Sequence, residues 1–153
     1  MNKSQGFTII ELMVAIAVAG VLLSVAVPSF QNIARNNAVR AATNDLIATI
    51  NLARQQSMSM RSEVSITPAT GGWSNGWSID FDEACAGEDA VYGVNESVTI
   101  TSTATELAFR ARGGMETGAG STFTVEHASG SSSTLCRVVT VNFFGKTTLE
   151  PCP

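Results

Sequence analysis

The longest apolar run of the chain lies near its N-terminus. Residues 7–27 read FTIIELMVAIAVAGVLLSVAV and include a single charged side chain, Glu11. An α-helix needs roughly 20 predominantly apolar residues to cross the hydrocarbon core of a bilayer. The pattern therefore predicts a membrane-spanning helix in this part of the chain.

The spacing of apolar residues changes after Pro28. They recur at mostly three- and four-residue intervals, which is typical of an amphipathic helix. The stripe consists of Phe30, Ile33, Ala38, Ala42, Leu46, Ile50 and Ala53. Because residues 64–67 (VSIT) alternate like a strand, the helix is predicted to end at Met60 or Arg61. Pro28 lacks a backbone donor and Gly20 weakens a helix, so a kink or a local loss of helix is expected between them.

Residues 62–153 are rich in Thr, Ser, Val and Gly, and their short alternating segments predict antiparallel strands. The expected strands are 63–67, 78–81, 98–102, 107–110, 121–127, 135–142 and 146–149. The dipeptide Asn75-Gly76 predicts a hairpin turn between Trp73 and Trp77, and both indole rings are expected to pack on the helix. The predicted fold class is α+β: a long N-terminal helix, membrane-spanning in its first half, packed on a C-terminal antiparallel β head.

Glu11 is the anomaly of the apolar run. A carboxylate inside an apolar helix is energetically costly, so it indicates a function and a partner for its charge. The alternative is that the side chain lies at the membrane interface and reaches the headgroups.

The residues around Glu11 carry a resemblance. A short leader with Lys3 is followed by Gly6-Phe7-Thr8-Ile9-Ile10-Glu11, the apolar run and Pro28. This order resembles the class III signal of type IV pilins and type II secretion pseudopilins. The resemblance implies that a prepilin peptidase removes residues 1–6, cutting between Gly6 and Phe7, and N-methylates Phe7. It also implies that Glu11 supports assembly by pairing with the Phe7 amine of a neighbouring subunit.

The head resembles a narrower group. The segment GGWSNGW (71–77), the segment LAFRARGG (107–114) and the closing hairpin that opens with Cys136 are similar to the GspH/FimT/FimU group of minor pilins and minor pseudopilins. The resemblance implies four parts: the leader 1–6, a transmembrane and filament-core helix 7–28, an amphipathic stalk helix 29–61 and a periplasmic head 62–153.

The function implied by the resemblance is structural, with no catalytic residue and no cofactor. It is that of a minor pilin at or near the tip of a type IV pilus, where it supports assembly. The alternatives are a minor pseudopilin of type II secretion and a DNA-uptake pilin. The implied partners are other major and minor pilins, the prepilin peptidase and the inner-membrane assembly platform. The implied location is the inner membrane, with the head in the periplasm, and then the surface filament.

Charge is unevenly distributed along the chain. The formal net charge is -4, from 9 Lys and Arg against 13 Asp and Glu. Residues 29–61 carry four arginines and one aspartate, a sum of +3, whereas residues 62–153 carry four cations and eleven acids, a sum of -7. An acidic head disfavours nucleic-acid binding. The opposite signs suggest either complementarity between stacked subunits or simply a solvated helix face.

The cysteines predict one disulfide. With a tight turn near Phe144-Gly145, antiparallel pairing places Cys136 opposite Cys152. A bridge between them closes a loop of about 15 residues, which corresponds to about 3 kcal/mol in the chain-entropy model. Cys85 is then either a free thiol or a competitor for Cys136.

The candidate catalytic and metal-binding residues lack the additional residues that a catalytic or metal site needs. His127 is the one histidine, and no nucleophile or orienting group forms a pattern with it. The acidic residues between Asp80 and Asp89 lack the spacing of a calcium loop, so a solvated loop is expected. The sequence thus predicts neither an enzyme nor a metal site.

Overall fold

The computed structural model describes residues 8–81, 90–116, 120–130 and 135–152. The chain forms two units, one ending at Ala34 and the other beginning at Arg35. Helix α1 (Ile9–Met60) contributes to both. Its end at Met60 is as predicted, and Arg61 follows with a positive φ of 54° that stops the helix.

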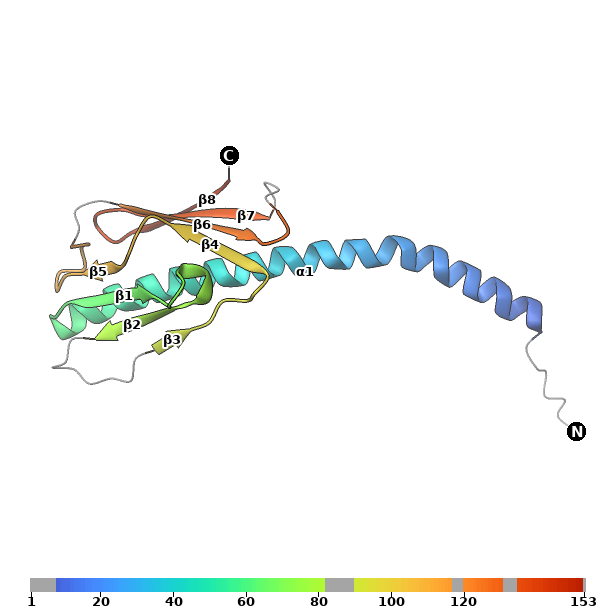
Figure 1. The fold of residues 1–153 in the computed structure, drawn as a ribbon, viewed down its shortest axis with the longest axis horizontal. Helices are drawn as coiled ribbons and strands as arrows, with labels where there is room; N and C mark the ends of the chain where they lie inside the picture. Colours follow the sequence, from blue (N-terminus) through green and yellow to red (C-terminus); the bar gives the residue numbers. More distant parts are fainter. Residues whose placement is uncertain (1–7, 82–89, 117–119, 131–134, 153) are drawn as a thin grey trace, which may run out of the picture. The chain divides into compact units, whose positions relative to one another are not determined.

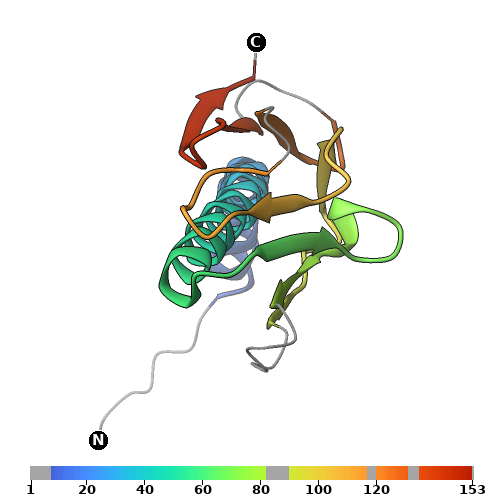
Figure 2. The same cartoon turned by 90° about the vertical axis from the view of Figure 1, so that its left-hand side faces the viewer.

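The second unit combines the last part of α1 with two four-stranded antiparallel sheets (Figure 1). The first sheet has the order β3-β2-β1-β5, formed by Ala90–Tyr92, Trp77–Phe81, Val64–Pro68 and Leu107–Phe109. The second has the order β4-β6-β7-β8, formed by Val98–Ser102, Ser121–His127, Cys136–Val141 and Thr147–Pro151. Viewed along the helix, both sheets lie beside it (Figure 2). This is the predicted α+β architecture.

The core of the second unit follows from the two periodicities of its sequence. On α1, Leu46, Ile50 and Ala53 are completely buried at the predicted spacing of three or four residues. On the strands, alternate residues such as Ile66 and Val125 are buried, while their neighbours are at least partly exposed. The head therefore has its own hydrophobic core, which includes the second half of α1.

Two members of the predicted helical stripe do not take part in this core. Phe30 is 71% exposed and Ile33 is 54% exposed. Both precede Arg35, where the second unit begins. The part of the stripe that is buried therefore begins after Ile33.

The tryptophan segment differs from the predicted hairpin. Trp73 lies in a short 3-10 helix, η1 (Trp73–Asn75), rather than on a strand, and β2 begins only at Trp77. Gly76 has a positive φ of 111° and lies against the Tyr92 carbonyl, which leaves no room for a side chain. A turn does occur at Asn75-Gly76, as predicted. The connection from β1 to β2 is nevertheless a loop that contains η1 rather than a two-residue hairpin turn. Strand β3, which pairs with β2, was not predicted.

Both indole rings are nevertheless buried, and each donates a hydrogen bond. Trp77 Nε1 donates to Thr49 Oγ1 on α1 at 3.1 Å, which confirms that this ring packs on the helix. Trp73 Nε1 donates to the Ala104 carbonyl at 2.8 Å, and its ring meets Phe123 edge-on at 4.9 Å. The Trp77 ring joins α1 to the first sheet, and the Trp73 ring joins η1 to the second sheet.

Candidate functional site

Glu11 closes a hydrogen-bonded ring at the start of α1. Its Oε2 accepts from both the backbone N–H and the hydroxyl of Thr8, each at 3.0 Å. In return, Thr8 Oγ1 accepts from the backbone N–H of Glu11 at 3.3 Å. Thr8 stands immediately before the first helical residue and Glu11 is the third residue within, so the pair is a capping box.

The capping box gives Glu11 a role that the sequence analysis missed. The signal was visible, because Thr-x-x-Glu directly before an apolar run is the sequence signature of this cap. Two donors at the helix start that otherwise lack intrahelical partners are satisfied locally. The negative charge also lies at the positive end of the helix dipole, where it is stabilising.

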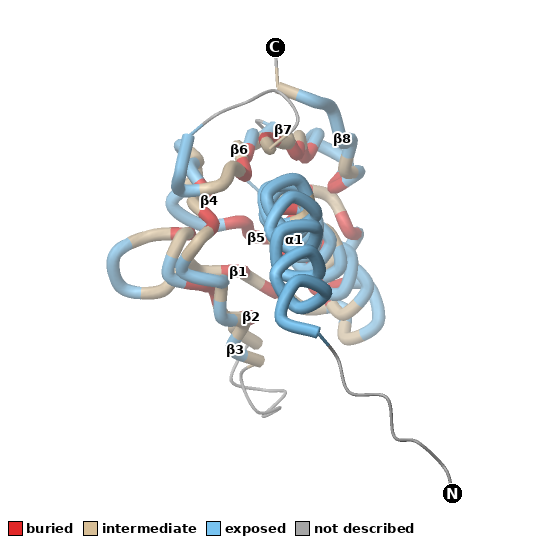
Figure 3. Tube along the Cα trace, turned by 90° about the vertical axis from the view of Figure 1, so that its right-hand side faces the viewer, coloured by how far each residue is buried: buried red, intermediate tan, exposed pale blue. Residues whose placement is uncertain are grey.

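The helix after Glu11 presents apolar side chains on all sides. Leu12, Ile16, Val21 and Leu22 are each more than half exposed, and Figure 3 shows this part of α1 as almost entirely exposed. It is long and apolar enough to cross a membrane. A helix that is apolar all round is stable only where a bilayer or other protein covers it.

The predicted break between Gly20 and Pro28 is not present in this structure. Every residue from 20 to 28 is helical. A side chain at Gly20 would meet no atom within 4 Å, so packing within the chain does not require a glycine there. Loss of helix in this segment remains a prediction for an assembled state.

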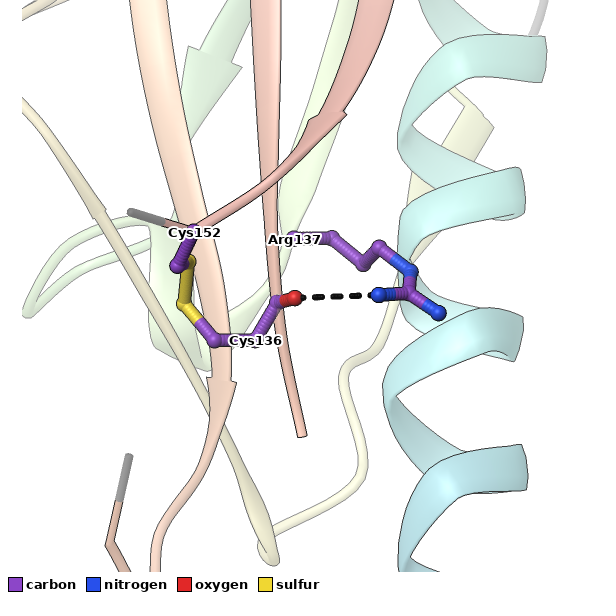
Figure 4. Close-up of a disulfide and its surroundings, with 3 residues drawn as sticks. All are labelled: Cys136, Arg137 and Cys152. Carbon is purple, nitrogen blue, oxygen red and sulfur yellow. Dashed lines mark hydrogen bonds between the residues drawn. A yellow bond between two sulfur atoms is a disulfide. The ribbon is translucent and has the colours of Figure 1, made fainter. Parts of the chain in front are cut away.

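The predicted processing site, Gly6 and Phe7, lies outside the described residues, as does Cys85. The disulfide between Cys136 and Cys152 is present, with the two Cα atoms 5.6 Å apart (Figure 4). Strands β7 and β8 pair Arg137 with Pro151, which is the register that the turn near Gly145 predicted. Arg137 Nη1 donates to the Cys136 carbonyl at 3.3 Å, beside the bridge (Figure 4).

His127 has an ordinary local role. Its Nδ1 lies 2.8 Å from Ser129 Oγ and accepts from the Ser129 N–H at 3.1 Å, which closes the turn after β6. Within the described parts of the chain, no three His, Cys, Asp or Glu residues are placed to share a metal ion. Most of the acidic stretch before Asp89 lies outside the described residues.

The fold and the N-terminal helix define the class of the protein. A capped apolar helix that continues into a two-sheet, disulfide-closed head is the architecture of a pilin-like subunit, which is structural rather than enzymatic. The chain belongs to the family "Type II transport protein GspH", whose model matches residues 42–145. Residues 1–27 match the prokaryotic N-terminal methylation motif.

Similarities to solved structures and to curated sequences are consistent with a pilin-like subunit. The chain has the fold of the type IV minor pilin FimU of Pseudomonas aeruginosa, with a TM-score of 0.62, 23% identity, and coverage of 75% of this chain and 90% of FimU. It is 41% identical over 49 residues to "Prepilin peptidase-dependent protein D" of Escherichia coli, covering 32% of this chain and 31% of that protein. It is 38% identical over 48 residues to the "Type IV major alpha-pilin" of Moraxella bovis, covering 31% and 30%. The matches to these curated relatives therefore span about a third of each relative's length.

Proposed function

We propose that the chain is a minor pilin of a type IV pilus that enters the filament at or near its tip and supports assembly. The observation that carries the proposal is the exposed apolar surface of α1 between Ile9 and Val27, whose first turn contains the hydrogen-bonded carboxylate of Glu11. This surface has no partner among the described residues. A filament core of packed helices would cover it and would also supply a cation for Glu11.

The proposed life cycle follows the motif at the N-terminus. Residues 1–6 are a leader that a prepilin peptidase removes between Gly6 and Phe7, after which Phe7 is N-methylated. Residues 7–28 anchor the subunit in the inner membrane, and residues 29–61 and 62–153 form the stalk and head in the periplasm. Exit from the membrane into the filament then exchanges lipid contacts for contacts with other major and minor pilins and the assembly platform.

A neighbouring subunit's Phe7 amine is the proposed counter-charge for Glu11. The Thr8 hydrogen bonds hold the carboxylate at the helix start. Two of its lone-pair directions are used by Thr8, and a carboxylate has further acceptor capacity for an ammonium group. Pairing would fix the axial register between subunits, as a buried polar residue does in a coiled coil.

Two variants separate the charge of Glu11 from its capping role. Glu11→Gln removes the charge but keeps an oxygen that can cap, because glutamine also occurs at this position of capping boxes. Thr8→Ala removes the hydroxyl and keeps the charge. Fractionation into membrane and sheared filaments, followed by immunoblotting, measures incorporation. We expect Glu11→Gln to be cleaved and retained in the membrane but absent from filaments, whereas Thr8→Ala is incorporated.

Two results would contradict this proposal. Equal incorporation of Glu11→Gln and the native chain would show that the charge is not needed. Mass spectrometry tests the processing step independently: Gly6→Val should retain the leader, and a mature methylated Phe7 in that variant would contradict a pilin-type signal.

A second candidate function is that of a minor pseudopilin in type II secretion. The family model over residues 42–145, which bears the name of a type II transport protein, favours it. Deleting the gene and assaying both surface pili and secreted enzymes distinguishes the two. Loss of secretion with intact pili would support the pseudopilin.

A further inference from the structure

A pocket in the head gathers arginines and exposed phenylalanines from three distant segments. It lies among the last turns of α1, the loop after β5 and the β7–β8 turn, and has a volume of about 380 Å³. We name it the arginine–phenylalanine pocket; its lining residues are Arg54, Arg110, Arg112, Gly114, Met115, Phe143 and Phe144. The charge sum of the head gave no sign of this local concentration of cations.

The frame of the pocket is held by hydrogen bonds to backbone carbonyl groups. Arg54 Nε donates to the Gly113 carbonyl at 3.0 Å, and the Met115 N–H donates to the Phe143 carbonyl at 3.0 Å. Gly145 has a φ of 71°, and a Cβ there would lie 2.8 Å from the Gly113 oxygen. The three segments are therefore fixed against one another, so the pocket is formed before any ligand arrives.

The surface of the pocket combines aromatic and cationic groups. Phe144 is 69% exposed and Phe143 is 45% exposed, with their rings edge-to-face at 5.4 Å. Arg110 and Arg112 are exposed, and Arg110 Nη2 donates to the Glu116 carbonyl at 2.9 Å. Among the residues that the structure describes, no acidic side chain lines the pocket.

We propose that the arginine–phenylalanine pocket binds an acidic peptide segment that carries a large apolar side chain, presented by a partner protein. Guanidinium groups bind carboxylates with two parallel hydrogen bonds, and an apolar side chain would cover the exposed phenyl rings. The pocket is cationic, whereas the whole unit 35–153 carries 8 cations against 12 acids, a sum of -4, so an acidic segment is directed to the pocket rather than to the acidic strands around it.

A nucleic acid fits this surface less well. An extended phosphate backbone would have to continue beyond the pocket across an acidic head. Next to the pocket, the carboxyl group of Glu63 interacts with Glu116, Glu106 and Arg110, which marks an acidic cluster along that path. A short peptide can place two carboxylates on the arginines without reaching this cluster. The inference holds whether a pilus or a secretion system uses the chain.

Fluorescence anisotropy with the purified full chain in detergent tests the proposal. The probe is a labelled peptide, Gly-Glu-Glu-Phe-Glu-Glu-Gly; its controls replace all glutamates by glutamine or the phenylalanine by alanine. We expect the acidic aromatic peptide to bind with a Kd of about 1 mM or tighter, and both control peptides to bind about fivefold or more weakly. Added salt should weaken binding.

Matched variants locate the site. Arg112→Gln and Phe144→Ser alter exposed pocket residues, whereas Arg40→Gln and Val91→Ser alter equally exposed residues elsewhere. Only Arg112→Gln and Phe144→Ser should weaken binding of the peptide, by about fivefold or more. Unchanged thermal unfolding of each variant would show that the head is intact.

Three outcomes would overturn the proposal. The first is no saturable binding of the acidic peptide at several times the expected Kd. The second is equal binding of the glutamine peptide, which would indicate an apolar surface only. The third is tighter binding of single-stranded oligothymidylate with the same sensitivity to Arg112→Gln, which would make the pocket a nucleic-acid site. None of these bears on leader cleavage or Glu11, so the proposed function is tested separately.

Discussion

The two parts of α1 use similar side chains for opposite purposes. Leu22, in the first part, is 65% exposed, whereas Leu46, in the second, is completely buried among the strands. The first part is apolar on all sides, while the second confines its apolar residues to one face. The comparison shows that the chain stabilises only the second part by itself. The first part depends on a bilayer or on other subunits.

Truncating one leucine in each part of α1 should give the largest difference in stability between the two parts. Leu46→Ala should lower the free energy of unfolding of the head by about 2–5 kcal/mol, because it leaves a cavity in a closed core. Leu22→Ala should change it by about 0.5 kcal/mol or less, because most of the Leu22 side chain is exposed. Denaturant unfolding of the full chain in detergent, followed by tryptophan fluorescence, measures both. Equal effects would show that Leu22 is buried in the same core.

The disulfide is the second distinction, because only the head is cross-linked. Replacing Cys136 and Cys152 together by serine should lower the free energy of unfolding by about 3 kcal/mol, since the unfolded chain gains freedom. The same denaturant titration with and without reductant provides the control. Native protein in reductant should behave like the double variant, and a large further loss would point to a bridge that involves Cys85.

A buried hydroxyl on the second part of α1 gives a smaller effect. Thr49→Val removes the acceptor of the Trp77 indole N–H and should cost about 1–3 kcal/mol, because the donor stays buried. Thr49→Ser retains the hydroxyl and should cost less. Ser24→Ala is the matched change on the exposed part, where the hydroxyl bonds only the Val21 carbonyl of its own helix. Ser24→Ala should leave the stability measured by thermal unfolding unchanged. Equal losses of stability in Thr49→Val and Ser24→Ala would contradict the distinction between the two parts of α1.

The smallest expected effect is a pH dependence in the head. Burial and the neighbouring Glu116 and Glu106 carboxylates raise the pKa of Glu63, and Arg110 partly offsets this. The folded state then holds a proton that the unfolded state has released, so the contribution of Glu63 to stability falls as pH rises above the ordinary glutamate pKa near 4.5. Glu63→Gln should flatten this slope in thermal unfolding measured from pH 4 to pH 7. An unchanged slope would assign it to other groups.

Elements with a strong local signal could be predicted from the amino-acid sequence. The apolar run, the helix end near Met60 and several alternating strands, including Val98–Ser102, are where the pattern placed them. The Cys136–Cys152 bridge was also predictable, because a tight turn fixes the register of the two strands beside it. Helical and strand periodicities are local properties, so they can be read without knowing the neighbours.

Features that depend on contacts between distant segments became visible only in the folded chain. The division of the strands into two sheets, the position of Trp73 in a 3-10 turn and the short strand β3 all follow from pairing across long stretches of chain. Phe30 is 71% exposed although the sequence places it in the apolar stripe. Arg54, Arg112 and Phe144 also come from distant segments, and only folding brings them together in one pocket. A charge or an apolar side chain has a known position along the chain, but its surroundings are set only when the chain folds around it.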